Sequence, residues 1–549
     1  MEFSTLVKTY LELEKTQSRL EMSAIIADFL KTTPSENLPD IINFLMGSAF
    51  APWSERELGV ANKLMIKSLS KTTGVAEGRI DGMVRDLGDT GKVAEKICAD
   101  ASQTTLFTET LTVEKVKESL NKMSDLGGKG SQDKKMAYIS EMLSSAGPVE
   151  TRYVVKLILG ELRLGVGEGV IKDAIVSAFG VSKELVENAC NLTSDLGEVA
   201  ATARKNGDFG LKEVGLKPGI PMKVMLAQKI SGIDEAVEKL GRCAFEIKYD
   251  GMRIQIHKSK EEIKLFTRRL ENVTKQFPEL VKEAGKNINA DSAIVEGELV
   301  AIEDNRKPRP FQDLSRRIKR KYDIEDMVES VPIEINLFDL VFLNGESLLE
   351  CGFSKRHEKL KGVINETGTF RIAEEVVTDD CVIAQKFYDG ALAMGHEGVM
   401  VKNLDAPYKP GSRVGYMYKI KPVMETLDLV ITGATWGEGR RANWFGSFLI
   451  SARDEVGGFC TIGRLGTGFT DEVLAEITET LKPLVLEEAG KEVVLKPGVV
   501  VEVAYEEIQK SPSYTSGYAL RFPRLVRIRD DKGAEDADTV ARVEQIASA

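Results

Sequence analysis

The hydrophobic pattern of this chain changes at residues 214–226, VGLKPGIPMKVML, where Pro218, Gly219 and Pro221 interrupt it. Upstream, apolar residues recur three and four positions apart, which is the period of an amphipathic helix. One such set is Ile25, Ile26, Phe29 and Leu30. Downstream, alternating apolar and polar residues predict short strands mixed with helices. Because the period changes, we expect separate domains and place a boundary after residue 214.

A second change follows residue 424, where the predicted strands become short and frequent and are separated by glycine and proline. This pattern is typical of a small barrel. The length of 549 residues also fits roughly three or four domains. We therefore predict a multidomain protein with an all-α domain at 1–214, an α+β domain at 215–424 and a β-barrel domain with a C-terminal helix at 425–549.

The strand predictions follow from β-branched and aromatic residues that alternate with polar ones. Between the two boundaries, the predicted strands are 244–249, 252–257, 263–267, 293–302, 333–342, 398–402 and 416–421. After the second boundary, they are 428–434, 447–452, 459–463, 498–505 and 525–529.

Composition excludes several classes of protein. No apolar run is long enough to cross a membrane, and the acidic N-terminus lacks the pattern of a signal peptide, so we expect a cytoplasmic protein. The six cysteines form no CxxC pair, which disfavours a structural zinc site and a disulfide framework. With only three histidines, the chain is poorly suited to catalysis by a histidine base.

The net charge of −11 argues only weakly against nucleic acid as a partner, because phosphate binding depends on local patches. One basic patch is RKPRPFQDLSRRIKRKY at residues 306–322, which is either a phosphate-binding segment or a solvated charged loop. A glycine-rich turn, RLGVGEG at 163–169, lies before a predicted helix. It either binds a phosphate or simply joins two helices.

Charged residues interrupt a stretch that otherwise alternates like two strands, FEIKYDGMRIQIHK at residues 245–258. Successive side chains of a strand point to opposite faces. One face of the first strand would then carry Glu246, Lys248 and Asp250, and the second strand would add Arg253. Since Asp-Gly favours a tight turn, we predict a hairpin. Its charged side is either an ordinary solvent-exposed face or a binding surface.

Charges interrupt three later strands in the same way. These are IVEGELVAI with Glu296 and Glu298, HEGVMVK with Glu397 and Lys402, and YMYKIKP with Lys419 and Lys421. Buried charges need partners, so we expect these side chains to converge on one another or on a charged ligand.

The kinds of charge indicate which ligand. Clustered lysines and arginines suit a polyphosphate, and Glu298 and Glu397 suit Mg²⁺, which binds one or two carboxylates together with phosphate oxygens. The chain contains no GxxxxGK[ST] motif and no GxGxxG between a strand and a helix. The sequence therefore predicts a nucleotide site built without a P-loop.

Lys248, Tyr249, Asp250, Gly251 and Arg253 resemble the KxDGxR signature of the covalent nucleotidyltransferases, which comprise DNA ligases, RNA ligases and mRNA capping enzymes. The resemblance extends over an ordered set of stretches and nearly the whole chain. The set is KYDGMR (248–253), FTRRLENVT (266–274), EGELVA (296–301), FDLVFLNGE (338–346), EGVMVK (397–402), YKIKP (418–422) and RFPRLVRIRDDK (521–532).

The set is most similar to the ATP-dependent DNA ligases of the archaeal and eukaryotic replicative type. Two further stretches, LKPGIPMKVMLA (216–227) and RPFQDLSRRIKRK (309–321), support this branch. The resemblance implies a helical domain that grips duplex DNA, an adenylation domain and an OB-fold barrel. It implies an enzyme that seals nicks between a 5′-phosphate and a 3′-hydroxyl during DNA replication, repair and recombination, with ATP and Mg²⁺. We expect a monomer.

The resemblance also implies roles around the base. Lys248 would attack the α-phosphate of ATP and carry AMP as a covalent phosphoramidate. A lysine in water has a pKa of about 10.4, so attack requires an environment that favours the neutral amine. Glu246 would accept a hydrogen bond from adenine, and Phe338 would stack on the base or belong to the core.

Further implied roles concern the ribose, the phosphates and the metal. The residues expected at the ribose and phosphates are Arg253, Arg268, Glu298, Arg413 and Lys419, with Lys421 in support. The metal ligands expected are Glu298 and Glu397. In the barrel, RIRDDK (527–532) would orient the departing pyrophosphate through Arg529, Asp530, Asp531 and Lys532.

Strand parity raises a question about Glu397 and Lys402, which lie on opposite faces of a regular strand. Either a bulge intervenes or only one of them reaches the site.

QTTLF, from Gln103 to Phe107, resembles a shortened binding box for a sliding clamp, with an aliphatic and an aromatic residue for a hydrophobic pocket. The alternative is an ordinary loop that leads into a helix.

Other classes of protein compete with this interpretation. An RNA ligase or a capping guanylyltransferase is disfavoured by the helical region of more than 200 residues, and an NAD-dependent ligase by the absence of a four-cysteine zinc set. A catalytically inactive DNA-binding scaffold would have lost the lysine or the carboxylates, yet Lys248, Glu298 and Glu397 are all present.

Overall fold

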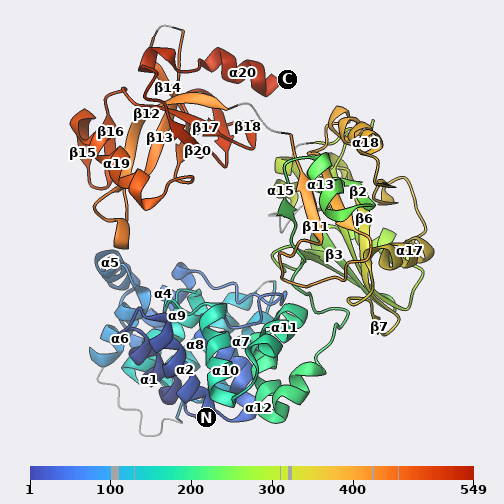
Figure 1. Ribbon diagram of the computed structural model, residues 1–549. Coiled ribbons are helices and arrows are strands. Elements are labelled where there is room, and N and C mark those ends of the chain that lie inside the picture. Colours follow the sequence, from blue (N-terminus) through green and yellow to red (C-terminus); the bar gives the residue numbers. More distant parts are fainter. Residues whose placement is uncertain are drawn as a thin grey trace. The chain divides into compact units, whose positions relative to one another are not determined.

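The computed structural model describes residues 1–100, 110–128, 130–303, 305–309, 311–318, 324–422, 426–455 and 457–548. The chain forms two compact units, Met1–Lys421 and Pro422–Ala549, which are described separately (Figure 1). The predicted clamp-binding segment 103–107 and part of the basic patch lie outside the described residues. No helix of the described part is long and apolar enough to cross a membrane.

The first unit begins with a helical region, as its hydrophobic period predicts (Figure 1). Its helices are α1 (Phe3–Leu13), α2 (Arg19–Thr32), α3 (Leu38–Leu45), α4 (Asn62–Thr73), α5 (Glu77–Leu87), α6 (Thr90–Asp100), α7 (Val113–Ser124), α8 (Ser131–Ser144), α9 (Pro148–Leu159), α10 (Glu168–Phe179), α11 (Lys183–Thr193) and α12 (Leu196–Lys212). Their apolar faces pack into one core, to which Phe3, Ile26, Tyr153 and Ile171 belong.

Local chemistry sets the ends of these helices. The Asp195 carboxylate accepts a hydrogen bond from the backbone N–H of Glu198 at 3.0 Å and caps the start of α12. Several helices end at a glycine in the left-handed conformation, such as Gly160 after α9 with a φ of 68°. The glycine-rich turn at 163–169 lies between α9 and the first turn of α10, and whether it binds a phosphate stays a prediction.

The rest of the first unit contains two sheets. One has the strand order β1 (Gln228–Lys229), β11 (Met417–Ile420), β10 (Val399–Asn403), β2 (Cys243–Ile247) and β9 (Glu375–Thr378). The other has the order β4 (Glu262–Thr267), β3 (Met252–Ser259), β5 (Ser292–Ala301), β6 (Ile333–Leu343) and β7 (Glu346–Ser347), with β8 (Phe370–Ile372) paired to β6.

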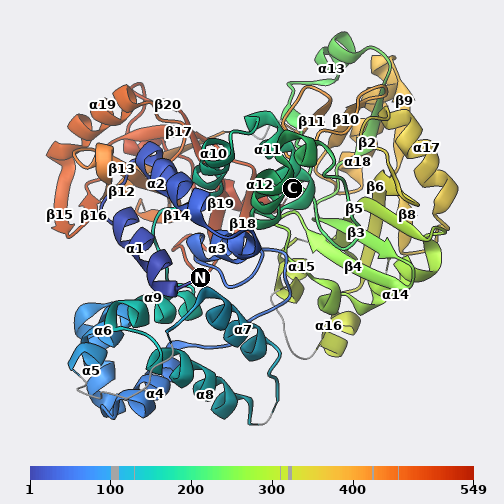
Figure 2. The same cartoon turned by 90° about the horizontal axis from the view of Figure 1, so that it is seen from below.

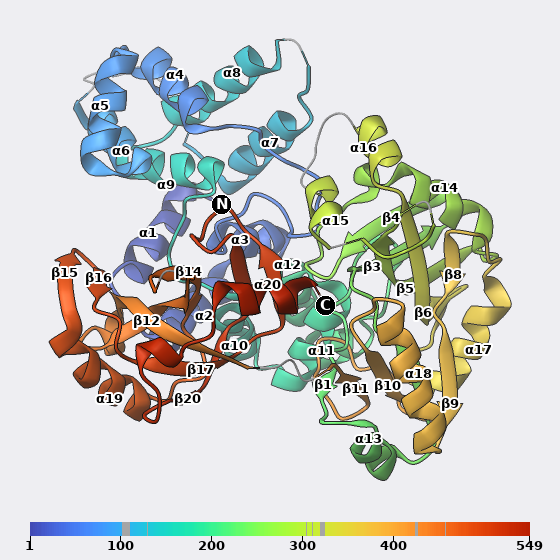
Figure 3. The same cartoon turned by 90° about the horizontal axis from the view of Figure 1, so that it is seen from above.

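Helices cover these sheets. They are α13 (Ile233–Leu240), α14 (Pro278–Asn287), α15 (Phe311–Ile318), α16 (Ile324–Ser330), α17 (Phe353–Val363) and α18 (Cys381–Ala393). Helix α14 packs against β3 and β4 (Figure 2), α17 against β6, and α18 against β2 and β9 (Figure 3). The apolar faces predicted for β2 and β3 are confirmed: Phe245 and Ile247 are buried in the core around β2, and Ile254 and Ile256 in the core around β3.

The hairpin predicted at Asp250-Gly251 is wrong. Strand β2 pairs with β9 and β10, whereas β3 pairs with β4 and β5, so the chain crosses from one sheet to the other between Lys248 and Met252. Neither residue of the dipeptide has the positive φ that a type I′ turn requires. A Cβ on Gly251 would lie 2.4 Å from the carbonyl oxygen of Leu299, so glycine serves a close approach to β5 instead of a turn.

The second unit is rich in strands, as predicted. Strands β14 (Phe459–Leu465), β13 (Phe445–Arg453), β12 (Leu427–Trp436), β16 (Glu492–Leu495) and β15 (Val485–Ala489) lie in that order, and β17 (Val500–Ala504) joins β12 to β20 (Arg524–Ile528). The unit also contains the strand pair β18 (Glu507–Lys510) and β19 (Tyr518–Arg521) and the helices α19 (Asp471–Leu481) and α20 (Val540–Ser548). Strand β12 pairs with β13 through two register shifts, and it also pairs with β17 at residues 427–430 and with β16 at residues 433–435.

Candidate active site

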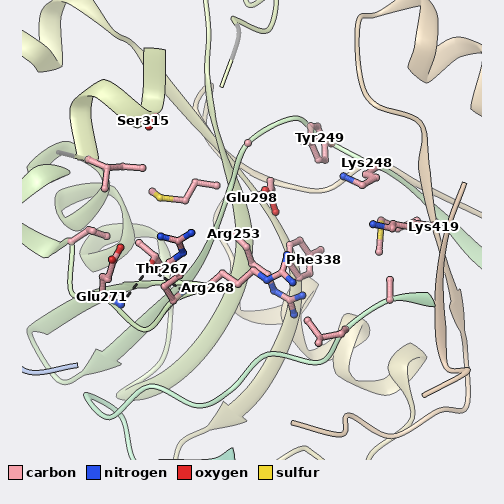
Figure 4. Close-up of a pocket in the computed structure, with 18 of the residues that line it drawn as sticks. Lys248, Tyr249, Arg253, Thr267, Arg268, Glu271, Glu298, Ser315, Phe338 and Lys419 are labelled. Carbon is pink, nitrogen blue, oxygen red and sulfur yellow. Dashed lines mark hydrogen bonds between the residues drawn. The ribbon is translucent and has the colours of Figure 1, made fainter. Parts of the chain in front are cut away.

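A cavity of about 890 Å³ opens in the first unit, with side chains from both sheets along its walls (Figure 4). The predicted residues that line it are Glu246, Lys248, Arg253, Arg268, Glu298, Phe338, Lys402, Arg413 and Lys419. Figure 4 shows Lys248 and Lys419 at one end and Arg268 at the other, with Arg253 and Phe338 between them. The cavity therefore brings together side chains that lie far apart in the sequence.

Lys248 lies where the chain leaves β2. Its backbone N–H donates to the carbonyl of Gly398 at 2.9 Å, and its carbonyl accepts from the N–H of Glu397 at 3.0 Å. Its ammonium group also contacts the Glu397 carboxylate, which Lys421 contacts at 2.9 Å. Burial alone would raise the pKa of Glu397, but the two lysines outweigh it and lower this pKa to about 2. Glu397 is therefore ionised and holds both ammonium groups.

The parity question is resolved by a break in the strand. Glu397 precedes β10 and is separated from it by Gly398, whose φ is 132°. A Cβ there would lie 2.2 Å from the carbonyl oxygen of Ile420, so the position requires glycine. Because the alternation starts only after Gly398, Glu397 contacts Lys248, and of these two predicted residues it is Lys402 that lines the cavity.

Glu298 and Arg253 are directly opposite each other on β5 and β3. Burial raises the pKa of Glu298 to about 7, although Lys248 and Arg253 act in the opposite direction. Glu397 and Asp250 add to the rise because a second negative charge disfavours ionisation. Glu298 is thus a carboxylate that a nearby cation would stabilise.

Glu246 lies on the cavity wall and is 2% exposed. Its Oε2 contacts the Lys402 ammonium at 2.6 Å, whereas its buried Oε1 has no hydrogen-bond partner among the described residues. Burial raises the pKa of Glu246, and Lys402 opposes this rise. The Lys402 ammonium also lies 4.7 Å from the centre of the Phe338 ring. An acceptor without a donor, beside an aromatic ring, is suited to a planar ligand with an amino group.

Behind Glu246 lie His357 and Glu375, and one ligand atom of each of the three residues lies within 4.8 Å of the others. His357 Nε2 is 3.0 Å from the Glu375 carboxylate, which Lys361 contacts at 2.9 Å. Burial would raise the pKa of Glu375, but His357 and Lys361 lower it to about 2. Because Lys402 and Lys361 already balance both carboxylates, we interpret this cluster as an ion-pair network and not as a metal site.

Sequence reasoning missed several residues of the cavity. Thr267 and Glu271 line it (Figure 4), and the Thr267 hydroxyl accepts from the Glu271 N–H at 3.3 Å. Both lie within FTRRLENVT, a stretch of the family resemblance, although the resemblance implies a role in it only for Arg268. Met400 and Met417 also line the cavity, and an apolar residue in a strand gives no signal that separates a cavity wall from a core.

In the second unit, Arg529 lies just after β20 and is held by carboxylates of the same unit. Its Nη1 contacts Asp428 at 2.9 Å and its Nη2 contacts Asp531 at 2.8 Å. Lys532 contacts Asp428 at 2.6 Å. The cations predicted from RIRDDK thus form a cluster on the carboxylate of Asp428.

Comparison with protein families gives three consecutive matches. The family "DNA ligase N terminus" matches residues 2–176, "ATP dependent DNA ligase domain" matches 224–421, and "ATP dependent DNA ligase C terminal region" matches 441–532. The middle match contains every residue that lines the cavity except Glu57, which belongs to the helical region.

Curated relatives and solved structures agree with these matches. The chain is 46% identical over 548 residues to a DNA ligase of Thermococcus fumicolans, which covers 100% of this chain and 98% of the relative. It is 44% identical to a DNA ligase of Archaeoglobus fulgidus, over 97% of this chain and 96% of the relative. The solved structure "Pmar-Lig_PreS3" shares the fold at a TM-score of 0.53 and 19% identity, covering 95% of this chain and 99% of its own. The chain therefore belongs to the family of ATP-dependent DNA ligases.

Proposed function

We propose that this enzyme seals nicks between a 5′-phosphate and a 3′-hydroxyl in duplex DNA, with ATP as the energy source and Lys248 as the carrier of AMP. The observation that carries this proposal is the position of Lys248. Its amine lies on the wall of a cavity that also contains Arg253, Glu298 and Lys419, and Glu397 holds it there. A nucleophile surrounded by cations suits a reaction at a phosphorus atom.

The chemistry comprises three displacements at phosphorus. The neutral amine of Lys248 attacks the α-phosphorus of ATP, so that an N–P bond forms, pyrophosphate leaves and the amine loses a proton. A 5′-phosphate oxygen of the nick then attacks the same phosphorus, breaks the N–P bond and returns the lysine, which takes up a proton again. Finally, the 3′-hydroxyl attacks the 5′-phosphorus, loses its proton and displaces AMP, which completes the phosphodiester bond.

The cavity supports specific roles for its residues. Glu246 Oε1, which has no partner among the described residues, would accept a hydrogen bond from the amino group of adenine, and the Phe338 ring would stack on the base. Cations along the wall would bind the ribose and the phosphates. These are Arg253, Arg268, Arg413 and Lys419, with Lys421 holding Glu397 from the other side.

Enzymes of this family use Mg²⁺, and two carboxylates fit that ion. Glu298 lines the cavity, and a bound cation would lower its raised pKa and favour the ionised form. Glu397 is already ionised, because its pKa is lowered. Bound there, Mg²⁺ would neutralise phosphate charge. Glu298 and Glu397 would hold the ion, and Glu397 would also keep its contact with the Lys248 ammonium group.

The three regions would divide the work. The helical domain at 1–214 would bind duplex DNA, the adenylation domain at 215–424 would activate the nick, and the domain at 425–549, an OB-fold with a C-terminal helix, would supply Arg529 and Lys532 to the departing pyrophosphate. These are the predicted boundaries, and the family matches support them. A cytoplasmic monomer that acts in replication, repair and recombination is consistent with this proposal.

Labelled ATP tests the function directly. The protein is incubated with α-³²P-ATP, and the label is then followed onto nicked duplex DNA. We expect label on the protein, then on the 5′-phosphate of the nick, and sealed DNA at the end. If the label passes only to single-stranded RNA, the protein is an RNA ligase instead. If it takes up label from GTP and transfers it to an RNA end, it is a capping enzyme. A protein that binds DNA but takes up no label would be a scaffold.

A sliding clamp is a second proposed partner, on the sequence alone. QTTLF carries the aliphatic and aromatic pair Leu106 and Phe107 that a hydrophobic pocket of a clamp would bind. Replacing both by alanine should weaken binding to the clamp and leave sealing of free nicked DNA unchanged. Clamp binding that does not change would discard the partner without affecting the ligase assignment.

A further inference from the structure

Tyr408 closes a ring of hydrogen bonds behind the cavity. Its hydroxyl donates to Glu296 Oε2 at 2.7 Å and accepts from the backbone N–H of Met225 at 2.9 Å. Arg253 completes the ring, because its Nη2 donates to Glu296 Oε2 at 2.7 Å and to the Tyr408 hydroxyl at 3.1 Å. Its Nη1 donates to the carbonyl of Met225 at 3.0 Å. Four chain segments therefore meet at one phenolic oxygen.

The ring lies in a dry environment. Tyr408 is 1% exposed and Glu296 is 0% exposed, so water does not compete for these hydrogen bonds. Burial, together with the neighbouring Glu296, raises the pKa of Tyr408 well above its ordinary value. The hydroxyl therefore keeps its proton and remains a donor to Glu296.

A second interaction fixes the loop that carries Tyr408. Arg356 forms two hydrogen bonds with the Asp339 carboxylate, at 2.8 and 3.0 Å, and donates to the carbonyl of Ala406 at 3.1 Å. Its guanidinium also lies 5.6 Å from the centre of the Tyr408 ring. Because Asp339 belongs to β6, the loop is tied to the sheet two residues before Tyr408.

Within the ring, only Arg253 lines the cavity. Both of its terminal nitrogens donate hydrogen bonds within this hydrogen-bonded ring, to Met225 and to Glu296. Its guanidinium carbon lies 5.3 Å from the centre of the aromatic side chain of Phe338. The Nε–H of Arg253 has no hydrogen-bond partner within the described ranges. The ring therefore determines the plane of a guanidinium that would otherwise rotate about its long side chain.

We propose that Tyr408 is a positioning residue for nucleotide binding, which acts through Glu296 to hold the Arg253 guanidinium in the orientation that binds ATP. This inference rests on the proposed function of the cavity and extends it to a residue that does not touch the ligand. Tyr408 is suited to this role because its single oxygen both donates to the anion and accepts from the cation. A phenylalanine would fill the same volume without either hydrogen bond.

The test is a binding cycle with α,β-methylene-ATP, an analogue that cannot transfer its adenylate. Tyr408→Phe should raise the Kd of this analogue about tenfold, because it removes the hydrogen bonds of the Tyr408 hydroxyl to Glu296 and Arg253, which are both charged groups. In an Arg253→Lys background, the same change should alter the Kd less than about twofold, because a lysine cannot use the ring. Tyr10→Phe is the matched control, since Tyr10 is buried, donates to the Phe44 carbonyl at 3.1 Å and does not line the cavity.

The outcomes are distinct. An equal tenfold loss in both backgrounds would show that Tyr408 acts independently of Arg253, and a lowered unfolding temperature with an unchanged Kd would show a structural role alone. Either result overturns the proposal. If Tyr408→Phe does not fold, Glu296→Gln replaces it in the same cycle, with the same expected Kd values. Failure of the proposed function is separate, because the wild-type protein would then neither bind the analogue nor take up label from ATP.

Discussion

Lys248 and Glu397 are joined twice, once through the backbone and once through their side chains. The Glu397 N–H donates to the Lys248 carbonyl at 3.0 Å, and the Lys248 ammonium contacts the Glu397 carboxylate. The two residues are 149 positions apart in the sequence. The backbone pairing thus brings the carboxylate to the amine, so the pairing of β2 with β10 places the two side chains together.

Replacement of Lys248 tests the nucleophile. Both Lys248→Ala and Lys248→Arg should abolish labelling of the protein by α-³²P-ATP, because neither side chain offers an amine that can become neutral. Lys248→Arg retains the positive charge beside Glu397, so its unfolding temperature should stay close to that of the wild type. Sealing of a nick that already carries 5′-adenylate should survive in both variants. Label on another residue of either variant would refute the assignment.

Glu298→Gln should raise the stability of the protein at pH 8 and lower its activity. The pKa of Glu298 is raised from 4.5 to about 7, so the folded protein binds this proton more tightly than the unfolded chain. Wild-type stability is therefore lost as the pH rises from about 4.5 to 7, and glutamine avoids this loss. In EDTA at pH 8, the variant should be more stable by about 3 kcal/mol, and the difference should nearly vanish at pH 4.5. Chemical unfolding at both pH values measures this.

The same variant should adenylylate itself at least about 100-fold more slowly than the wild type at pH 8, because the carboxylate that we assign to the ribose or the metal is gone. Glu262→Gln is the control, since Glu262 lies on β4 in an exposed pair with Lys264 at 3.1 Å. It should change neither quantity measurably. A stable Glu298→Gln enzyme with normal activity would remove Glu298 from the site.

Gly251→Ala should disturb the crossing between the two sheets. The added methyl group would meet the Leu299 carbonyl oxygen at 2.4 Å, and backbone atoms cannot move aside without cost. We expect a loss of about 1–3 kcal/mol, with a larger relative loss of self-adenylylation because Lys248 lies just before the crossing. Gly362→Ala in α17 is the matched control: its Cβ would meet nothing within 4 Å, so it should be neutral or stabilising by up to about 1 kcal/mol. Equal effects of the two changes would contradict the close approach.

Arg356→Met should be strongly destabilising. Arg356 is 1% exposed and forms two hydrogen bonds with Asp339, which is 3% exposed, so the variant leaves a buried carboxylate without its partner. We expect a loss of about 3–5 kcal/mol. Lys359→Met on the same helix breaks the exposed pair with Glu346 and should cost less than about 1 kcal/mol. Urea unfolding of the two variants compares them, and a loss below 1 kcal/mol for Arg356→Met would show that Asp339 finds another partner.

Within the second half of the first unit, the sequence predicted the strands but not their partners. Alternation in FEIKYDGMRIQIHK correctly placed Phe245 and Ile254 in the core, because a side chain's direction along a strand depends only on its neighbours in the chain. The same stretch suggested a hairpin, which was wrong. Whether two adjacent strands pair with each other depends on β5 and β10, which are distant in sequence, and local propensity carries no information about them.

The charged residues of the site could be predicted because a charge inside an apolar strand is costly unless a partner or ligand compensates it. Their identities also carry the family resemblance, so the sequence alone predicts Lys248, Glu246 and Glu298 as residues of the site. The roles of these residues stay predictions. Tyr408 gave no such signal, since a tyrosine beside prolines and glycines in a loop is ordinary.

By itself, the sequence determined the order of helical and strand-rich regions, the alternation within the strands and the charges of the site, because these follow from local period and residue type. Tertiary structure alone decided that the chain crosses between the sheets at Gly251 and that Tyr408 hydrogen-bonds Arg253. It also decided that the regular strand β10 begins only after Gly398, so that the parity of a strand does not relate Glu397 to Lys402. Each of these depends on an approach of a few ångströms between residues that are not neighbours in the chain.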